Sequence, residues 1–108
     1  MISKELLHAV MGVGIKEIKS IENDMVFYTY MDIPDGCDIH GRINIYELMG
    51  MVKEWGLENS CTIMSFIDFD GTAFANVFCL TDHKKVSFQG AKEYDAVFKA
   101  GQLILMQQ

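Results

Sequence analysis

Apolar side chains recur at helical spacing near the start of the chain. Leu6, Leu7 and Val10 fall on one side of a helix, and Ser3 stands before them in a position to cap its first turn. Gly12 follows the apolar stripe and is expected to end the helix. The pattern therefore predicts a short amphipathic helix that packs against the rest of the protein.

The next two segments are typical of extended structure. Residues 25–33 are rich in Val, Phe, Tyr and Thr and predict a strand, whereas residues 15–22 fit neither period cleanly. Asn23-Asp24 separates the two segments, and both residue types tolerate left-handed backbone angles, so we predict a two-residue hairpin. Residues 33–42 contain the only proline and two glycines and are expected to form an exposed loop.

A second helix is predicted over residues 45–55. Asn44 is a good N-cap, and Glu47 three residues later completes a capping-box pattern. Gly56 and Leu57 suit a stop in which the glycine takes a left-handed conformation. The apolar residues of this segment share one side, which is typical of a helix lying on a sheet.

Two apolar runs, 61–69 and 72–80, are joined by Asp70-Gly71. This dipeptide between extended runs favours a type I′ hairpin, because both turn residues must accept a positive φ. The turn fixes a register in which Ile67 opposes Phe74 and Ile63 opposes Phe78. The other face then carries Met64 and Phe66 opposite the small residues Ala75 and Val77. Because both faces are apolar, we expect this hairpin to be covered on both sides, by the helices or by another subunit.

The remaining chain predicts one further strand and a helix. Residues 86–88 favour a short strand, and residues 91–100 favour a helix that begins after Gly90, while residues 103–106 fit either a strand or more helix. We therefore predict one α+β domain over 1–108, with a mainly antiparallel sheet of four to five strands packed with two to three helices. The expected order is α-β-β-α-β-β-(β)-α, which is similar to that of small profilin-like and roadblock-type interaction domains.

Composition narrows the classes of function. The formal net charge is −6 and the longest basic cluster is the pair Lys84-Lys85, which argues against binding nucleic acid. No apolar run reaches the roughly 20 residues that a membrane helix needs, so we expect no membrane contact. Three cysteines, an odd number, indicate a reducing compartment without a disulfide framework. The sequence thus predicts an acidic, cytoplasmic protein.

One short motif suggests chemistry. Residues 68–72, Asp-Phe-Asp-Gly-Thr, resemble the nucleophile motif of the haloacid dehalogenase superfamily, which implies Asp68 as nucleophile and Asp70 as acid/base. That family also needs a downstream α/β domain, and only 36 residues follow Thr72. We therefore interpret the motif as a hairpin turn, and we expect neither enzymatic activity nor a cofactor.

Two binding sites remain as alternatives. Cys37 and His40, together with Cys79 and His83, are ligand types of a tetrahedral zinc site, although their spacing matches no paired motif. The other alternative is a pocket for an apolar or cationic small molecule between the helices and the sheet, with these lining residues: Met51, Trp55, Phe74 and Phe78.

The leading hypothesis is a non-enzymatic interaction domain. The two-sided apolar hairpin favours self-association, as a homodimer, together with binding of a protein partner. The residues predicted to form the interface are Met64, Phe66, Ala75, Val77 and Met49.

Overall fold

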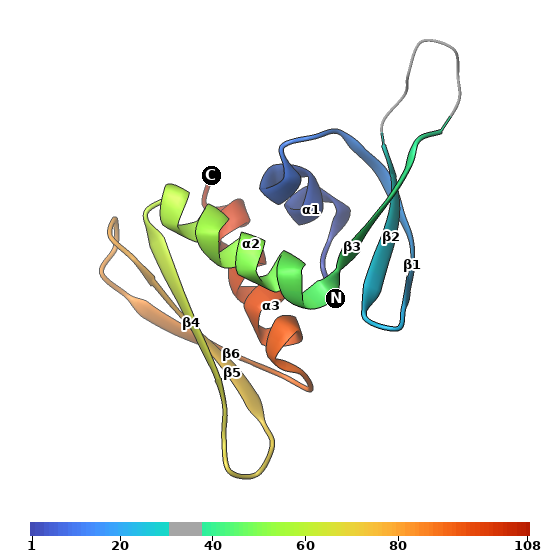
Figure 1. Cartoon of the computed structure of the whole chain (residues 1–108). Helices are drawn as coiled ribbons and strands as arrows, with labels where there is room; N and C mark the ends of the chain where they lie inside the picture. Colours follow the sequence, from blue (N-terminus) through green and yellow to red (C-terminus); the bar gives the residue numbers. More distant parts are fainter. Residues whose placement is uncertain (31–37) are drawn as a thin grey trace.

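The computed structural model describes residues 1–30 and 38–108, which form three helices and six strands (Figure 1). The elements follow in the order α1 (Lys4–Met11), β1 (Ile15–Glu22), β2 (Met25–Tyr30), β3 (His40–Asn44), α2 (Ile45–Glu58), β4 (Cys61–Ile67), β5 (Ala73–Cys79), β6 (Lys85–Gly90) and α3 (Glu93–Met106). The α+β class and the antiparallel pairing are thus confirmed.

The strands form two sheets, whereas a single sheet of four to five strands was predicted. Sheet A has the order β1-β2-β3 and sheet B has the order β4-β5-β6, and every neighbouring pair is antiparallel. Figure 1 shows the helices in the middle, with sheet A on one side of them and sheet B on the other. The principal extents are 48 × 32 × 16 Å and the radius of gyration is 14.6 Å. A compact domain of this length has a radius of gyration of about 13 Å, so the chain is comparatively extended.

Helix ends follow the local sequence where a side chain caps them. The hydroxyl of Ser3 accepts a hydrogen bond from the N–H of Leu6, and α1 ends at Gly12, whose φ is +72°. The side chain of Asn44 accepts hydrogen bonds from the N–H groups of Tyr46 and Glu47 at the start of α2.

One predicted helix boundary needs correction, and one that the sequence left open can be assigned. Helix α2 continues through Gly56 to Glu58, whereas a stop at Gly56 was predicted. A side chain at Gly56 would meet the carbonyl oxygen of Cys61 and the side chain of Ile63 at 3.3 Å, so the glycine allows α2 to approach β4 closely. Residues 103–106, left open between strand and helix, belong to α3.

Sheet A begins with the predicted two-residue hairpin. Asn23 and Asp24 both have positive φ, 51° and 62°, as this kind of turn requires. The register shifts between Ile15 and Glu17 and again between Ile18 and Ser20, so strand β1 is bulged twice. The third strand, β3, lies partly where a loop was predicted, and its Gly41 packs under the ring of Tyr28, where a Cβ would stand 2.6 Å from ring carbons.

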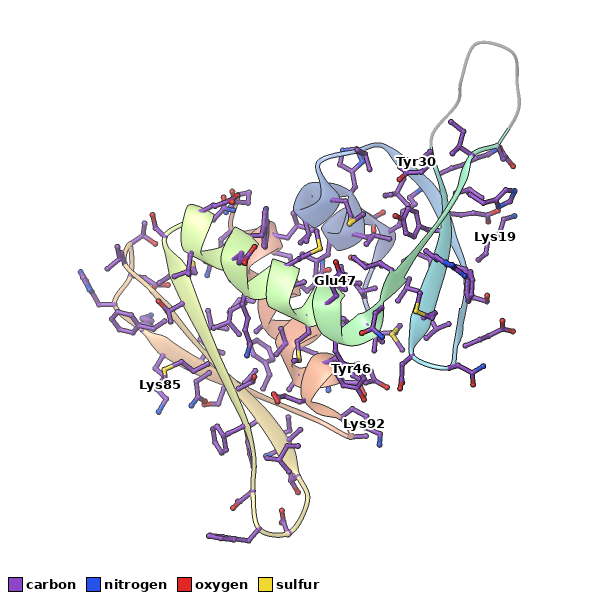
Figure 2. All side chains as sticks on the ribbon, in the orientation of Figure 1. Lys19, Tyr30, Tyr46, Glu47, Lys85 and Lys92 are labelled. Atoms are coloured by element: carbon purple, nitrogen blue, oxygen red, sulfur yellow. A yellow bond between two sulfur atoms is a disulfide. The ribbon has the colours of Figure 1, made fainter. Side chains whose placement is uncertain are left out.

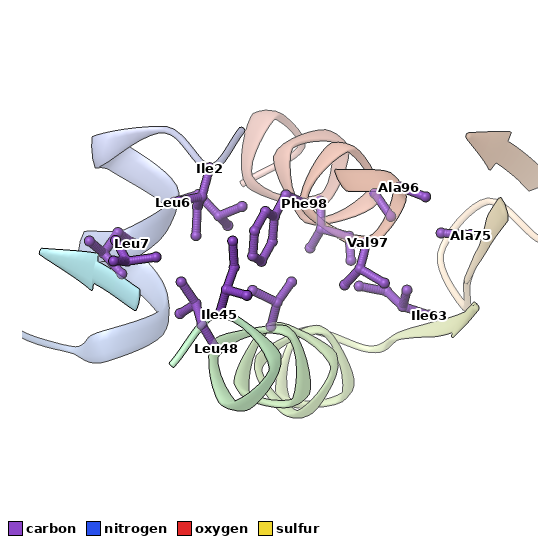
Figure 3. Close-up of a cluster of buried hydrophobic side chains, with 14 of the residues drawn as sticks. Ile2, Leu6, Leu7, Ile45, Leu48, Ile63, Ala75, Ala96, Val97 and Phe98 are labelled. Carbon is purple, nitrogen blue, oxygen red and sulfur yellow. The ribbon is translucent and has the colours of Figure 1, made fainter. Parts of the chain in front are cut away.

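The core lies between the three helices and the facing sides of both sheets, with Ile15, Val26 and Tyr28 contributed by sheet A. Figure 3 shows Phe98 of α3 near Leu6 of α1 and Ile45 of α2, and all three are buried. Farther along, Ile63 and Ala75 of sheet B meet the same helix layer and are also buried. Helix α3 supplies six buried residues, more than either other helix, which makes it the centre of the packing.

Candidate functional site: the outer face of sheet B

The β4–β5 hairpin is confirmed, but its predicted register was wrong by one residue. Ile63 opposes Val77 and Ile67 opposes Ala73, whereas Phe78 and Phe74 were predicted as their partners. The connection is a three-residue loop in which only Gly71 has a positive φ, +86°. The N–H of Asp68 donates to the carbonyl of Thr72 at 2.8 Å and closes this loop. A type I′ turn needs two positive φ values, so the predicted turn type was wrong as well.

The carboxylates of the motif at 68–72 bond to the hairpin loop. Asp68 accepts a hydrogen bond from the N–H of Phe69 at 2.7 Å, and Asp70 accepts one from the N–H of Thr72 at 2.9 Å. Hydrogen bonding by Thr72, first from its backbone and then from its side chain, lowers the pKa of Asp70 below its usual value. Both side chains are exposed at the tip of the hairpin.

A change of register by one residue moves each side chain of a strand to the opposite face. The predicted interface residues are therefore divided. Met64 and Phe66 point away from the helices and are 66% and 47% exposed, whereas Ala75 and Val77 point toward the helices and are buried. The placement of Ala75 and Val77 on the exposed face was thus wrong. Met49 lies on α2 and lines a cavity of about 280 Å³ near the loop end of the hairpin, together with Ile67 and Gly71.

The outer face of sheet B is the side directed away from the helices. Phe66 and Phe74 stack on it with ring centroids 5.3 Å apart and planes 18° from parallel, and Phe78 is 43% exposed. Ser87 donates a hydrogen bond from its hydroxyl to the side chain of Asn76 at 2.6 Å. The register assigns these positions to the face: Thr62, Met64, Phe66, Phe74, Asn76, Phe78, Lys85, Ser87 and Gln89. Only Lys85, at a corner, is charged.

The outer face of sheet A differs in kind. Its register places Glu17 and Glu22 of β1 on the same side as His40 and Arg42 of β3. Glu17 pairs with Lys19, and near this face Lys16 pairs with Asp38 at 2.7 Å. These charges suit a solvent-facing surface. One chain thus carries a charged outer face on one sheet and an apolar outer face on the other.

The members of the predicted small-molecule pocket lie on different layers. Met51 and Trp55 belong to α2 and are partly buried against the core. Phe74 and Phe78 belong to the outer face of sheet B, on the opposite side of the sheet from the helices. The register error accounts for this separation.

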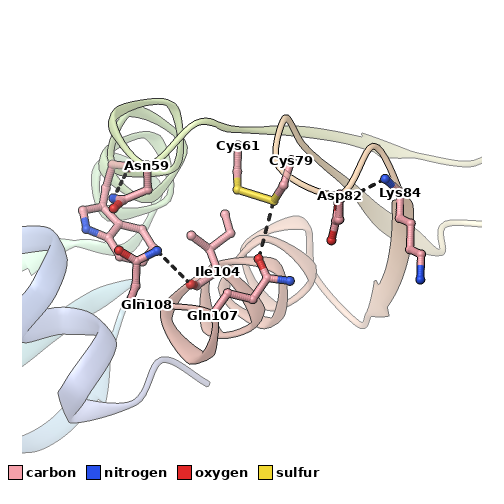
Figure 4. The surroundings of a disulfide bond; sticks show 9 residues. Asn59, Cys61, Cys79, Asp82, Lys84, Ile104, Gln107 and Gln108 are labelled. Carbon is pink, nitrogen blue, oxygen red and sulfur yellow. Dashed lines mark hydrogen bonds between the residues drawn. A yellow bond between two sulfur atoms is a disulfide. The ribbon is translucent and has the colours of Figure 1, made fainter.

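The predicted zinc ligands are also not brought together. Cys79 forms a disulfide with Cys61, and Figure 4 shows this bond beside the end of α3. His40 begins β3 in sheet A, and His83 follows β5, while Cys37 lies outside the described residues. Among residues 1–30 and 38–108, no group of three or more His, Cys, Asp or Glu side chains is arranged to hold a metal. The disulfide itself corrects the expectation that the cysteines would be unpaired.

Comparison with protein families, with curated proteins and with solved structures finds no match to this chain. In the part of the chain that the structure describes, no helix has the length and apolar character needed to span a membrane.

Proposed function

We propose that this protein is a non-enzymatic interaction domain that forms a homodimer through the outer face of sheet B. The observation that carries the proposal is the exposed apolar character of this face, with Met64, Phe66 and Phe78 each more than two fifths exposed. Contiguous exposed apolar surface of this kind marks interaction sites, because water is a poor solvent for it.

The distribution of charge allows a second copy of the chain to occupy this face. Each chain carries a net charge of −6, so two chains repel each other over most of their surfaces. None of the nine strand positions of this face is acidic; Lys85 lies at one corner, and Asp68 continues the face only at the hairpin loop. Two copies related by a two-fold axis can therefore stack these faces without opposing like charges at the centre.

The shape of the protein supports the same arrangement. The helices lie on one side of sheet B, and no element of the described residues covers its other side, where Met64 and Phe66 are exposed. Leu80, which follows β5 and is 63% exposed, continues the register of the outer face beyond Phe78 and extends the apolar surface. A stack of two such sheets would place a second apolar layer on this side, about 10 Å away.

Two other parts of the proposal follow from the residues. The carboxylates at 68–72 bond to their own turn, which gives them a structural task and supports a non-enzymatic domain. A cytoplasmic location stays a prediction. Its basis in cysteine usage is weakened by the Cys61–Cys79 disulfide, because such bonds persist mainly in oxidising compartments.

Sedimentation equilibrium with a matched pair of variants tests the dimer. Met64→Lys places a charge on the outer face, and Leu57→Lys places the same charge on α2 at a residue of similar exposure, 62% against 66%. Protein concentrations of about 1 to 500 μM cover the dissociation constants of weak specific dimers. As the concentration rises through this range, we expect the wild-type protein and Leu57→Lys to change from monomer to dimer. Met64→Lys should stay monomeric with unchanged unfolding behaviour. A monomeric wild-type protein throughout this range, or equal dimerisation of both variants, would overturn the proposal.

A further inference from the structure

Strand β6 leaves one regular edge of sheet B unpaired. It pairs with β5 on one side without any register shift. Within residues 1–30 and 38–108, no strand pairs with its other side. Strand β1 of sheet A is different, because its two bulges at Lys16 and Lys19 interrupt the regular edge that another strand would need. The β6 edge lacks this protection.

The backbone groups that point outward from β6 can be derived from the ladder. Two backbone hydrogen bonds fix the pattern between β4 and β5: Asp68 N–H donates to the carbonyl of Thr72, and Leu80 N–H donates to the carbonyl of Ser60. Even-numbered residues of β4 and β5 therefore bond to each other. Bonded and non-bonded pairs alternate along antiparallel strands, so odd-numbered residues of β5 bond to even-numbered residues of β6. Lys85, Ser87 and Gln89 consequently direct their N–H and C=O groups away from the sheet.

A groove lies beside this edge on the helix side. Val86 and Phe88 of β6 face the helices, yet Val86 is 38% exposed because α3 does not cover the edge completely. The groove has a volume of about 260 Å³, and its lining residues are Phe88, Lys99, Gln102, Leu103 and Met106. An added strand would direct every second side chain toward this largely apolar groove.

The charge of the edge is opposite to that of the whole chain. Residues 83–92 contain three lysines and no acidic residue, although the net charge of the protein is −6. Figure 2 shows Lys85 and Lys92 near opposite ends of β6. Lys99 reaches from α3 to the carbonyl of Gln89, which its ammonium group contacts at 2.7 Å. Lysines therefore flank the free edge at both ends.

We propose that the β6 edge binds an extended, acidic segment of a partner protein as a fourth strand of sheet B. Main-chain hydrogen bonds to Lys85, to Ser87 and to the N–H of Gln89, whose carbonyl already accepts from Lys99, hold the segment, as in other cases of strand addition. Apolar side chains of the segment enter the groove beside Phe88. Its carboxylates alternate with them on the other side of the strand and at its ends, near Lys85 and Lys99.

A second copy of β6 fits this edge less well than an acidic segment. A two-fold antiparallel pairing centred on Ser87 would set Lys85 of each chain opposite Gln89 of the other, a pair without charge complementarity, whereas carboxylates of an acidic segment can pair with the lysines. The proposed site also uses backbone groups of the edge rather than the outer face, so it is independent of the homodimer.

The test uses a synthetic peptide of about nine residues in which valine and glutamate alternate, long enough to span the six residues of β6. Binding is followed by fluorescence anisotropy of the labelled peptide and by amide hydrogen exchange of the protein. We expect slowed exchange at Lys85, Ser87 and Gln89, and binding that weakens as salt rises. A peptide of alternating valine and lysine serves as the control and should not bind.

Ser87→Pro removes the central outward N–H without removing a bond to β5, because that N–H points away from β5. We expect at least a tenfold loss of peptide affinity, whereas Ser87→Thr, which keeps the donor, should bind as the wild type does. Exchange at Val86 and Phe88 reports whether the β5–β6 ladder of the proline variant is intact. Lys99→Gln keeps that backbone unchanged and should weaken binding severalfold and reduce its salt dependence.

Several results would overturn the proposal. These are no binding of the acidic peptide, equal binding of the acidic and basic peptides, or unchanged affinity in both Ser87→Pro and Lys99→Gln. Dissociation of the homodimer by the acidic peptide would show that a second copy occupies the edge instead. The Met64→Lys variant separates the two proposals, because it should bind the acidic peptide normally while it remains monomeric.

Discussion

Reduction of the Cys61–Cys79 disulfide is expected to destabilise the protein by about 3 kcal/mol. The bond closes a loop with a sequence separation of 18 residues across the β4–β5 hairpin. For a loop of this length, the chain-entropy relation gives about 11 cal/mol/K of entropy removed from the unfolded chain, or about 3 kcal/mol at 25 °C. Both half-cystines are buried, so the reduced thiols would stay in the same apolar surroundings and offer little compensation.

Urea unfolding followed by the fluorescence of Trp55, the only tryptophan, measures this difference. With a urea dependence of about 1 to 3 kcal/mol/M, the midpoint should fall by about 1 to 3 M after reduction. The variant with Cys61→Ala and Cys79→Ala should unfold near the reduced midpoint and should not respond to reductant. Cys37→Ser should behave like the wild type under both conditions, because Cys37 is not part of this bond.

Two outcomes would refute the reasoning. One is equal urea midpoints for oxidised and reduced protein. The other is a count of three free thiols in protein purified without reductant, since the disulfide leaves one.

Two further predictions concern packing and pH. Gly101→Ala should destabilise the protein by about 1 to 2 kcal/mol, because the added Cβ would stand 2.7 Å from Cγ1 of Val52. Gly50→Ala should stabilise it by about 0.5 to 1 kcal/mol, because no atom lies within 4 Å of the added Cβ and alanine favours the helix. Urea unfolding of both variants measures the two changes. Burial raises the pKa of Tyr28 to about 12, so the neutral ring is favoured in the folded state. This stabilisation is fully present below about pH 10, the pKa of tyrosine in the unfolded chain, and is lost as the pH rises toward 12. Urea unfolding at several alkaline pH values should show this loss in the wild type and not in Tyr28→Phe.

The two hairpins show which part of the fold local sequence can predict. Asn23-Asp24 forms the expected two-residue turn, with both φ values positive. Asp70-Gly71 is similar in sequence, yet it forms a three-residue loop with one positive φ. The difference lies in Asp68 and Asp70, whose carboxylates accept nearby N–H groups at 2.7 and 2.9 Å and favour the longer loop. A dipeptide rule does not include these neighbouring side chains.

That one-residue difference determined most of the errors at the candidate site. It moved Phe74 and Phe78 to the outer face and moved Ala75 and Val77 toward the helices. The same difference places Cys61 opposite Cys79, where the two sulfurs can bond, whereas the predicted register paired Cys61 with Leu80. Two facing apolar runs allow either register, because neither has a polar side that would exclude it.

Strand β3 and the division into two sheets depend on tertiary contacts that the local pattern does not contain. Residues 40–44 include a single buried apolar residue, Ile43, and no alternation of apolar and polar side chains. Gly41 is needed there because the ring of Tyr28 occupies the space that a Cβ would fill. Such a contact between β2 and β3 is visible only when both strands are in place.

Both proposals place function on sheet B, and they use different groups of it. The homodimer uses side chains of the outer face, while the partner segment uses outward backbone groups of β6 and the groove under α3. Stacking two outer faces about a two-fold axis leaves both β6 edges open, so one dimer would offer two equivalent basic edges. A partner that carries two acidic strand-forming segments would then bind the dimer more tightly than it binds the monomeric Met64→Lys variant. A partner with one such segment would bind each site of the dimer and the monomeric variant with equal affinity. The dependence of partner affinity on dimerisation thus links the two surfaces.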